Sequence, residues 1–306
     1  MTTEKGFHPR NIHHQAYDFD ALIKVFPKLA SFVKKNKYGD LGINFSDANG
    51  VLCLNQALLT HHYQIRDWSI PKGHLCPPIP GRVDYLHYLA DLLAEDHKGV
   101  IPVGTKTKGL DIGTGTSCIY PILGNSIYGW KFVGSDIDTN AINHAKTILA
   151  ANKTLKKNIK TRFQATQDNI FKDLVKPEEK FDFTMCNPPF YSSLKEANHA
   201  SDRKVKNLNA NKEKKGHPPV KEGKPSNFGG VKAELWCPGG ETAFIKKMIN
   251  ESTEFKKQCG WFTTLVSNKE NLVEFTELLK KIQAKEFRTI EMHHGQKIGH
   301  ILAWRF

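Results

Sequence analysis

The sequence predicts an α/β protein in which an open, largely parallel sheet over residues 81–306 follows a small helical element over residues 1–80. Two observations predict this arrangement. From residue 108 onward, short apolar segments alternate with helical segments and a glycine-rich loop, an order typical of parallel sheets with helices on their faces. Before residue 80, short helical patterns are interrupted by proline and glycine, and no comparable run of strands occurs.

The composition is that of a globular protein with a basic surface. Hydrophobic residues make up 39% and charged residues 25% of the 306 positions, and no apolar run approaches the roughly 18 residues of a membrane span. The first ten residues lack the apolar core of a signal peptide, so we expect a cytoplasmic protein. The formal net charge of +13 favours polyanionic partners, among which nucleic acids come first.

The cysteines and histidines do not predict a metal site. The six cysteines occur singly, without a C-x-x-C pair. The histidine doublets at positions 13–14, 61–62 and 293–294 have no cysteine or carboxylate partner at a fixed spacing. We therefore expect neither a bound metal nor a disulfide framework.

The N-terminal element is expected to contain helical segments at residues 19–34 and 48–62, followed by a turn-rich stretch at residues 70–81. Residues 82–95 then carry apolar side chains at a helical period and are expected to lead into the sheet. These patterns put the boundary between the two parts at residue 80.

The sheet is expected from a series of apolar segments and one hairpin. The expected strands are residues 109–112, 131–136, 159–165, 181–186 and 260–266. A helix over residues 139–153, capped by Asp138, separates the second strand from the third. Near the end of the sequence, residues 288–292 and 300–306 flank a turn-rich segment, which predicts an antiparallel hairpin at the edge of the sheet.

Residues 191–240 interrupt this pattern with a long basic segment. It has almost no apolar periodicity and contains ten lysine and arginine residues. An insertion of this length inside a compact domain is usually functional or disordered, and a solvated loop without a partner is the alternative interpretation.

The first candidate for chemistry is the loop after the first expected strand, Leu110-Asp111-Ile112-Gly113-Thr114-Gly115. Gly113 and Gly115 let the backbone approach a ligand at the carboxyl end of a parallel sheet, and Asp111 precedes them. The run lacks the third glycine of a dinucleotide fingerprint, since position 118 is Cys, and it lacks the Gly-Lys-Ser/Thr of a P-loop. Without further signals, a tight turn explains it about as well.

An acidic residue about twenty residues further on favours a cofactor-binding role for this loop. The strand at residues 131–136 leads into Ser135-Asp136-Ile137-Asp138, where a carboxylate can accept hydrogen bonds from both hydroxyls of a ribose. Asp136 is preferred for that role and Asp138 for the helix cap, although the two assignments can be exchanged. A glycine loop with a ribose acid fits NAD and S-adenosylmethionine alike.

The tetrad Asn187, Pro188, Pro189 and Phe190 separates these possibilities. It follows directly on the apolar strand at residues 181–186. Asn-Pro-Pro also forms turns, but its position at the carboxyl end of a strand, downstream of the cofactor signature, favours a catalytic role.

The chemistry of an adenine amine explains the residue types of the tetrad. The exocyclic nitrogen is a poor nucleophile because its lone pair is delocalised into the ring. The Asn187 side-chain oxygen and the Pro188 carbonyl can accept its two N–H bonds and so favour the tetrahedral, positively charged transition state. Pro189 stiffens the turn, and Phe190 can stack on the base, a contact worth about 1–3 kcal/mol in single-strand sites. No general base is required, because the protonated product can lose its proton to water.

With these motifs the sequence resembles Rossmann-like amino-methyltransferases, which act on adenine N6, cytosine N4 or glutamine amides. It is most similar to the RlmF family, bacterial 23S ribosomal RNA adenine-N6 methyltransferases, which are related to the eukaryotic U6 small nuclear RNA adenine-N6 methyltransferase. The similar segments span nearly the whole chain and include residues 8–11, 75–82, 111–124, 186–190, 227–230, 234–237, 239–241 and 261–267. The resemblance implies cofactor contacts from Arg82, Gly113, Ser117 and the acid at Asp136, with catalysis at the tetrad. Where relatives commonly have Glu, this chain has the shorter Asp136, which leaves Asp138 as the alternative.

One further cofactor contact is expected after the third strand. Sheets of this kind usually offer a side chain there to the cofactor's adenine, and Asp168 or Asn169 can provide it. Capping of a helix is an equally good explanation for either residue.

The expected reaction is S-adenosylmethionine-dependent methylation of an adenine N6 amine in 23S ribosomal RNA, either free or in an assembly intermediate of the large subunit. The target adenine is expected in a loop or bulge, or flipped out, because duplex RNA hides base identity. The alternatives are an adenine of a small nuclear or messenger RNA, a protein glutamine amide, and an RNA-binding sensor of the cofactor. The basic charge opposes the glutamine amide, and the intact Asn187 and Phe190 oppose the sensor.

Overall fold

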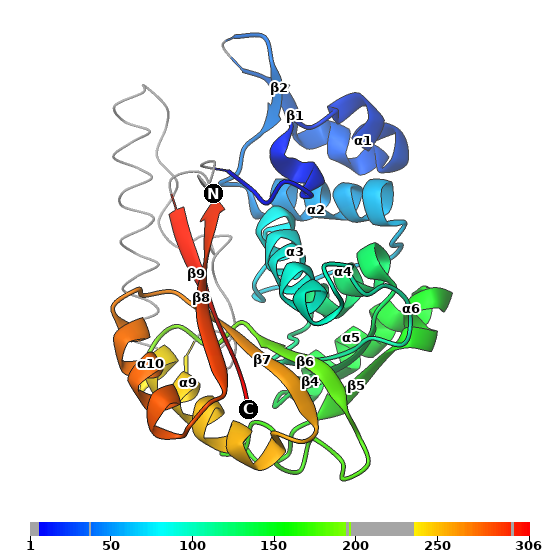
Figure 1. Cartoon of the computed structure of the whole chain (residues 1–306). Coiled ribbons are helices and arrows are strands. Elements are labelled where there is room, and N and C mark those ends of the chain that lie inside the picture. The colour runs from blue at the N-terminus through cyan, green and yellow to red at the C-terminus, as the bar shows by residue number, and fades with distance from the viewer. Residues whose placement is uncertain (1–5, 37, 194–195, 197–235, 295–296) are drawn as a thin grey trace. The chain divides into compact units, whose positions relative to one another are not determined.

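The computed structural model describes residues 6–36, 38–193, 196, 236–294 and 297–306 (Figure 1). The chain divides into two compact units. One comprises residues 1–16, 77–188 and 241–306, and the other residues 17–76 and 189–240. The predicted basic segment at 191–240 lies outside the described residues except for 191–193, 196 and 236–240. No helix in the described part of the chain is long and apolar enough to cross a membrane.

The first unit is built on a seven-stranded sheet with the strand order β5-β4-β3-β6-β7-β9-β8. All strand pairs from β5 to β7 are parallel, and β9 is antiparallel to both of its neighbours. The strands are β3 (Lys108–Ile112), β4 (Lys131–Asp136), β5 (Ile159–Phe163), β6 (Phe181–Cys186), β7 (Cys259–Val266), β8 (Glu286–His294) and β9 (Lys297–Arg305). The predicted strands and the predicted hairpin are confirmed, although the hairpin is longer than expected and its second strand pairs with β7.

The helices lie on the two faces of this sheet (Figure 1). On one face are α3 (Ile79–Asp96), α4 (Ile119–Tyr128) and α5 (Thr139–Ala151), followed by the short α6 (Lys153–Asn158). On the other are α9 (Gly240–Ser252), η3 (Thr253–Phe255) and α10 (Asn271–Lys281). The helix expected at residues 139–153 thus ends two residues early, at Ala151, and α6 follows it directly.

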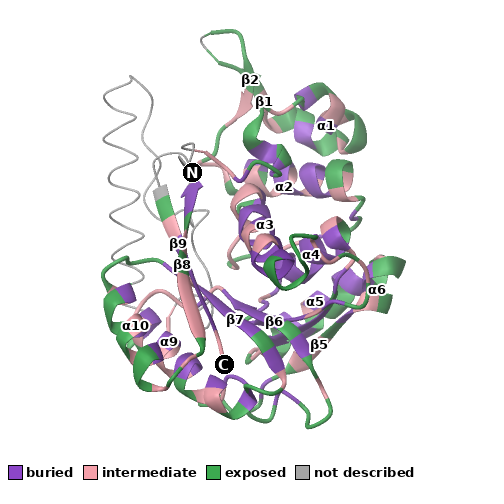
Figure 2. Cartoon of the chain, viewed as in Figure 1, coloured by how far each residue is buried: buried purple, intermediate pink, exposed green. Residues whose placement is uncertain are grey.

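Side chains alternate along β3, and this alternation determines which of its residues face the helices on each side of the sheet. Leu110 and Ile112 belong to the apolar core under α9 and α10. Because neighbouring residues of a strand point to opposite faces, Gly109 and Asp111 are directed toward α3 and α4. At Gly109 a side chain is excluded, since a Cβ there would lie 2.4 Å from the Phe183 ring. β6 and β7 are almost wholly buried, whereas α6 is largely exposed (Figure 2).

The second unit contains the helical part that the sequence predicts near its start. Its elements are α1 (Phe19–Val25), η2 (Pro27–Phe32), β1 (Val33–Lys35), β2 (Leu41–Ile43) and α2 (Ala48–Tyr63). The helix expected over residues 19–34 is broken in two, since α1 ends at Val25 and the 3-10 helix η2 follows, and the expectation is wrong at residues 33–34, which belong to β1. Pro27 lacks an N–H and restricts the residue before it, so α1 stops, and Val33 then pairs antiparallel with Ile43.

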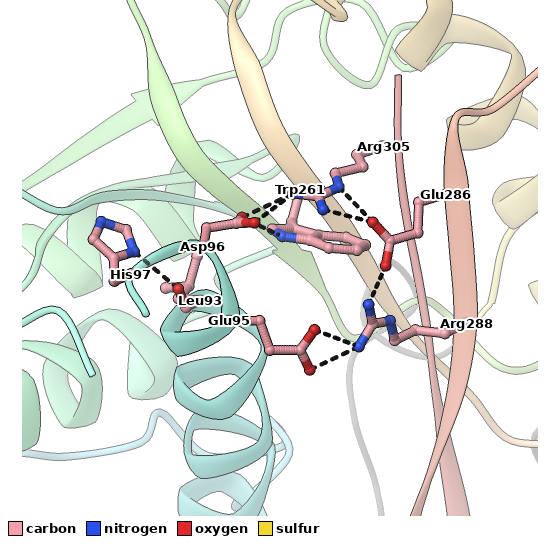
Figure 3. Close-up of polar contacts among 8 residues, drawn as sticks. All are labelled: Leu93, Glu95, Asp96, His97, Trp261, Glu286, Arg288 and Arg305. Carbon is pink, nitrogen blue, oxygen red and sulfur yellow. Dashed lines mark hydrogen bonds and ion pairs between the residues drawn. The ribbon is translucent and has the colours of Figure 1, made fainter. Parts of the chain in front are cut away.

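The C-terminal end of α3 is tied to the sheet by a network of charges around Trp261 (Figure 3). Arg305 of β9 donates to Asp96 at 2.7 Å and to Glu286, and its guanidinium carbon lies 4.3 Å from the centre of the Trp261 ring. The Trp261 indole N–H donates to the same Asp96 carboxylate at 3.0 Å. One guanidinium nitrogen of Arg288, on β8, donates to both carboxylate oxygens of Glu95. These contacts lie near the amino end of β7 and hold the last turn of α3 against the sheet.

The first three turns of α3 and Asp91 further along it are held by residues from the start of the chain, where η1 (Ile12–His14) lies. The fully buried Asn11 donates from its amide to the Pro80 carbonyl at 2.9 Å and to Asp84 at 2.5 Å. Arg10 pairs with Asp91 at 2.7 Å. The segment similar to the RlmF family at residues 8–11 therefore braces α3.

Candidate active site

The loop after β3 reaches across to the end of β4. Gly113 and Gly115 have φ angles of +73° and +63°, a left-handed conformation that glycine adopts without strain. The Thr114 N–H donates to the Ser135 carbonyl at 2.8 Å. A Cβ at Gly134 would lie 2.8 Å from the Thr114 hydroxyl, so the close approach of loop and strand requires glycine there. Both glycines of the expected cofactor loop thus adopt a backbone conformation that favours glycine.

The two acids after β4 have different tasks. Asp138 accepts from the Asn140 N–H at 2.8 Å and caps α5, which confirms the predicted cap. Asp136 turns back to the glycine loop, where one carboxylate oxygen accepts from the Gly115 N–H at 2.8 Å and the other from the Asp138 N–H at 2.9 Å. Asp136 is the acid that lies beside the glycines.

Two exposed apolar side chains accompany Asp136, and sequence reasoning missed both. Ile137 follows it directly and is 38% exposed. Phe163, the last residue of β5, is the cross-strand partner of Asp136 and is 46% exposed. A large apolar residue at the carboxyl end of a strand, next to a predicted ribose acid, is the signal that could have identified them.

Asp111 is a buried carboxyl group on the α3 and α4 face of β3. It is 1% exposed, and neither oxygen has a hydrogen bond of good geometry within the described residues. Burial raises the pKa of Asp111 to about 7. The nearby Thr114 hydroxyl and Arg82 oppose this shift, while Asp136 adds to it. Such a group is poised to ionise when a cation arrives.

Arg82 comes from the first turns of α3. One Nη donates to the Tyr120 hydroxyl at 2.8 Å, and the guanidinium carbon lies 5.3 Å from the centre of that ring. Its Nε is buried and has no hydrogen-bond partner in the part of the chain that the structure describes. The Arg82 charge is also close enough to lower the pKa of Asp111. A guanidinium group and a buried carboxyl group therefore lie together beside the glycine loop.

The tetrad begins at the end of β6, the neighbour of β3. Ile112 pairs with Cys186, so Asn187 follows β6 where Gly113 follows β3. The Asn187 side-chain oxygen is buried without a hydrogen-bond partner among the described residues. Pro188 is buried and ends this segment of the first unit. Pro189 and Phe190 begin the next segment, which belongs to the second unit.

The strand before the tetrad, β6, is held in place by hydrogen bonds that involve β7 and α3. The Thr263 hydroxyl donates to the Thr184 carbonyl at 2.8 Å, so the Tyr85 hydroxyl is the donor in its 2.8 Å bond with Thr263. Tyr85 lies on α3, one turn after Arg82. The same helix thus supports both the anion-binding side chain and β6.

The loop after β5 is positioned by a carboxylate from α9. Glu251 accepts the backbone N–H groups of residues 170–172, at 2.5 to 3.1 Å. Asn169 is half-buried and donates to Asp173 at 2.8 Å, and Asp168 is fully exposed and lies 3.3 Å from Lys247. Asn169 is the more sheltered of the two residues expected near the cofactor. Ser117, also expected there, is 8% exposed in the turn that leads into α4.

The carboxyl ends of β3 to β6 meet at the point where the strand order reverses. From β3 the chain adds β4 and β5 on one side and β6 and β7 on the other. Open α/β sheets bind their ligands at such a switch point. The glycine loop, Asp136, Arg82, Asp111 and Asn187 all belong to this region. All six cysteines are free, and the described residues contain no group of three or more side chains placed to hold a metal ion.

Comparison with known proteins gives matches over the whole chain. A family model described as RNA methyltransferase matches residues 1–306. A Ribosomal RNA large subunit methyltransferase F of Photobacterium profundum is 53% identical over 311 residues, covering 99% of this chain and 92% of the relative. Its namesake in Flavobacterium johnsoniae is 52% identical over 301 residues, covering 98% of this chain and 93% of the relative.

Solved structures of human METTL16 are similar in fold. The catalytic domain in complex with MAT2A 3'UTR hairpin 1 has a TM-score of 0.78 and 29% identity, covering 99% of this chain and 96% of that one. The N-terminal domain in complex with SAH has a TM-score of 0.75 and 28% identity, covering 99% of both chains. The Rossmann-like fold and the resemblance to the RlmF family are confirmed, and this chain belongs to the family of RNA methyltransferases.

Proposed function

We propose that this chain transfers a methyl group from S-adenosylmethionine to the N6 amine of an adenine in large-subunit ribosomal RNA. The carrying observation is the buried side-chain oxygen of Asn187, which has no hydrogen-bond partner among the described residues and lies at the switch point of the sheet, one strand away from Gly113. A buried acceptor without a donor is costly unless a ligand supplies one. An amine with two N–H bonds is such a ligand.

The residues beside the glycine loop fit the amino-acid part of S-adenosylmethionine. The guanidinium of Arg82, with its unpaired Nε, would hold the carboxylate. Asp111 would hold the ammonium group, because its carboxyl is unpaired and ionises near neutral pH. Gly113, Gly115 and Ser117 would provide backbone and hydroxyl contacts in the turn between them. When bound, the cofactor supplies an electrophilic methyl group.

The ends of β4 and β5 fit the adenosine part. Asp136 would accept hydrogen bonds from the ribose hydroxyls. Ile137 and Phe163, exposed on either side of it, would cover the faces of the cofactor's adenine. Asn169 would offer its side chain to the edge of that ring. Asp138 is occupied as the cap of α5, which supports Asp136 as the ribose ligand.

The tetrad would act on the target base. The Asn187 Oδ1 and the Pro188 carbonyl accept the two N–H bonds of the amine, and so stabilise the positive charge that develops on nitrogen. Pro189 stiffens the turn and Phe190 stacks on the base, which orients the nitrogen toward the methyl group. After transfer the nitrogen loses its extra proton to water.

The large-subunit ribosomal RNA is preferred as the substrate because relatives named for it are just over 50% identical along nearly the whole chain. The METTL16 catalytic domain in complex with MAT2A 3'UTR hairpin 1 is 29% identical, which makes an RNA hairpin of that kind the second candidate. We propose that residues 1–80 and the basic segment 191–240 contact RNA. The ten lysine and arginine residues of the basic segment support this, because positive charge suits a phosphate backbone. Ribosomal RNA as substrate would place the reaction in the cytoplasm.

The proposal is tested by transferring labelled methyl from S-adenosylmethionine to total RNA of a strain that lacks this gene, followed by nucleoside analysis. N6-methyladenosine in the large ribosomal RNA is expected, and the Asn187→Ala protein is the control for background. Label in messenger RNA only would favour the second candidate. Label that resists ribonuclease but not protease would point to a glutamine amide and overturn the proposal.

A further inference from the structure

A 25-residue stretch of the first unit carries only positive charges. Residues 139–163, which form α5, α6 and β5, contain six Lys and Arg residues and neither Asp nor Glu. They supply nearly half of the net charge of +13. Arg162 is paired with Glu179 at 2.7 Å, so one of the six charges is neutralised within the fold. The five lysines have no ion-pair partner among the residues that the structure describes.

Five lysines gather at the amino ends of β4 and β5, and we call them the lysine edge: Lys131, Lys153, Lys156, Lys157 and Lys160. Lys131 begins β4, and Lys160 lies one residue into β5, where it pairs with Val133. The other three lie on α6, at spacings of three and four residues that put helix positions near one another. All five are exposed, and none forms an ion pair within the described part of the chain.

The lysine edge is remote from the candidate active site. α5 starts at its Asp138 cap, beside Asp136, and its 13 residues span about 20 Å. α6 and the start of β5 follow at the far end of that helix. β5 is also three strands away from β6, or about 14 Å. A partner that touches both places must extend more than about 20 Å from the target base.

The chemistry of the lysine edge suits a phosphate backbone rather than bases. Single-strand sites combine positive charge with exposed aromatic rings on which bases stack. Between residues 131 and 163 the exposed large hydrophobic side chains are Ile137 and Phe163, and both lie at the opposite, carboxyl ends of the strands. Duplex RNA is recognised mainly through its backbone and shape, for which lysine point charges suffice.

We propose that the lysine edge binds the phosphate backbone of a double-helical arm of the RNA substrate, at a distance from the methylated adenine. This inference rests on the proposed function, since it extends the same RNA away from the active site. It predicts that a large, folded RNA is held more tightly than a fragment around the target.

The test removes three charges of α6 at once, in Lys153→Ala/Lys156→Ala/Lys157→Ala. The matched control removes the same charge from the exposed lysines at the end of α10 and beyond, in Lys280→Ala/Lys281→Ala/Lys285→Ala. The RNAs are a transcript of the complete large-subunit ribosomal RNA and the shortest fragment of it that the wild-type protein methylates. Affinity is measured over a series of salt concentrations.

For the α6 variant, the Kd of the complete transcript is expected to rise about tenfold, and the slope of log Kd against log salt to fall by about 2 to 3. The Kd of the short fragment, the turnover on it and the KM for S-adenosylmethionine should stay at wild-type values. The control should retain wild-type affinity for both RNAs. A second variant, Lys131→Ala/Lys160→Ala, tests the strand side of the lysine edge and should act in the same direction.

Equal affinity of the α6 variant and the control for the complete transcript would overturn the inference while the proposed function stands. So would an equal loss on both RNAs, which would place the lysines near the target base. If an acidic polypeptide displaced the complete transcript as strongly as duplex RNA does, the lysine edge would bind an acidic protein partner, and the inference would be overturned. Failure of the wild-type protein to methylate any RNA would refute the proposed function, a result separate from all of these.

Discussion

The raised pKa of Asp111 predicts a pH-dependent affinity for the cofactor. In the free protein, burial holds this pKa at about 7, so about a tenth of Asp111 is ionised at pH 6 and about nine tenths at pH 8. If the ionised carboxylate binds the ammonium group, affinity must rise with pH through this window. Between pH 8 and pH 6 the affinity for S-adenosylhomocysteine should fall about tenfold, equivalent to about 1.4 kcal/mol.

The assay is titration calorimetry with S-adenosylhomocysteine at several pH values, on the wild-type protein and on Asp111→Asn. The variant has almost the same shape but no titrating group, so its affinity should be lower at pH 8 and should lack the tenfold dependence. Titration of the ligand's own amine affects both proteins equally and cancels in the comparison. An equal pH dependence in both proteins would refute the role given to Asp111.

The unfolding free energies of the wild-type protein and Asp111→Asn independently test whether the pKa of Asp111 is raised in the folded protein. The folded-state pKa of Asp111 is raised above its unfolded value of about 3.9, so its favourable contribution is complete below pH 4 and is lost as the pH rises to about 7. Relative to Asp111→Asn, the wild-type protein should lose up to about 4 kcal/mol of unfolding free energy over this window. A difference that does not change with pH would mean that Asp111 is ionised with an ordinary pKa.

Three further substitutions follow from the contacts of the site and its supports. Asn187→Ala should lower kcat at least about a hundredfold and leave the Kd of S-adenosylhomocysteine nearly unchanged, because the lost acceptor acts mainly in the transition state; equal losses in both would make the tetrad part of the cofactor pocket. Asn11→Ala should raise the KM for S-adenosylmethionine several-fold with little change in kcat, because Asn11 braces the turn of α3 that carries Arg82. Steady-state kinetics with saturating RNA separates the effects on KM and kcat, and a fall in kcat alone would contradict this role. Arg305→Met should lower the unfolding free energy by about 1–3 kcal/mol, since it removes a cation that Asp96, Glu286 and the Trp261 ring share, although Glu286 and Trp261 keep their contacts with Arg288. Urea denaturation measures the loss, and the exposed Lys281→Ala, with no ion-pair partner in the described part of the chain, should stay close to wild type.

Much of the fold is predictable because its signals are local. Apolar strands, their spacing and the glycines of the β3 loop can be recognised within a few residues of sequence. The carboxyl ends of parallel strands meet at one edge, so Asp136 and Asn187 could be assigned to one region before their positions were known. Asp138 was recognisable as a cap because the next residues form a helix.

Other features depend on which surfaces pack together. Pro27 marks a possible break within residues 19–34, but the apolar pattern of this segment does not show that Val33 pairs with Ile43 in a two-stranded sheet. Ile137 and Phe163 look like ordinary core residues in the sequence, yet both are partly exposed beside Asp136. Exposure and burial are properties of neighbours, and the neighbours of a strand end come from distant parts of the chain.

By itself, the sequence determined the type of sheet, the order of its strands along the chain and the candidate site residues at the strand ends, because these follow from periodicity and from short motifs. Only the tertiary structure decided that Arg82 stands beside Asp111, that Asn11 and Arg305 hold the two ends of α3, and that burial lifts the pKa of one carboxyl to about 7. The physical reason is distance along the chain. A pKa depends on all the surfaces that exclude water from a group, and those surfaces are assembled only when the chain folds.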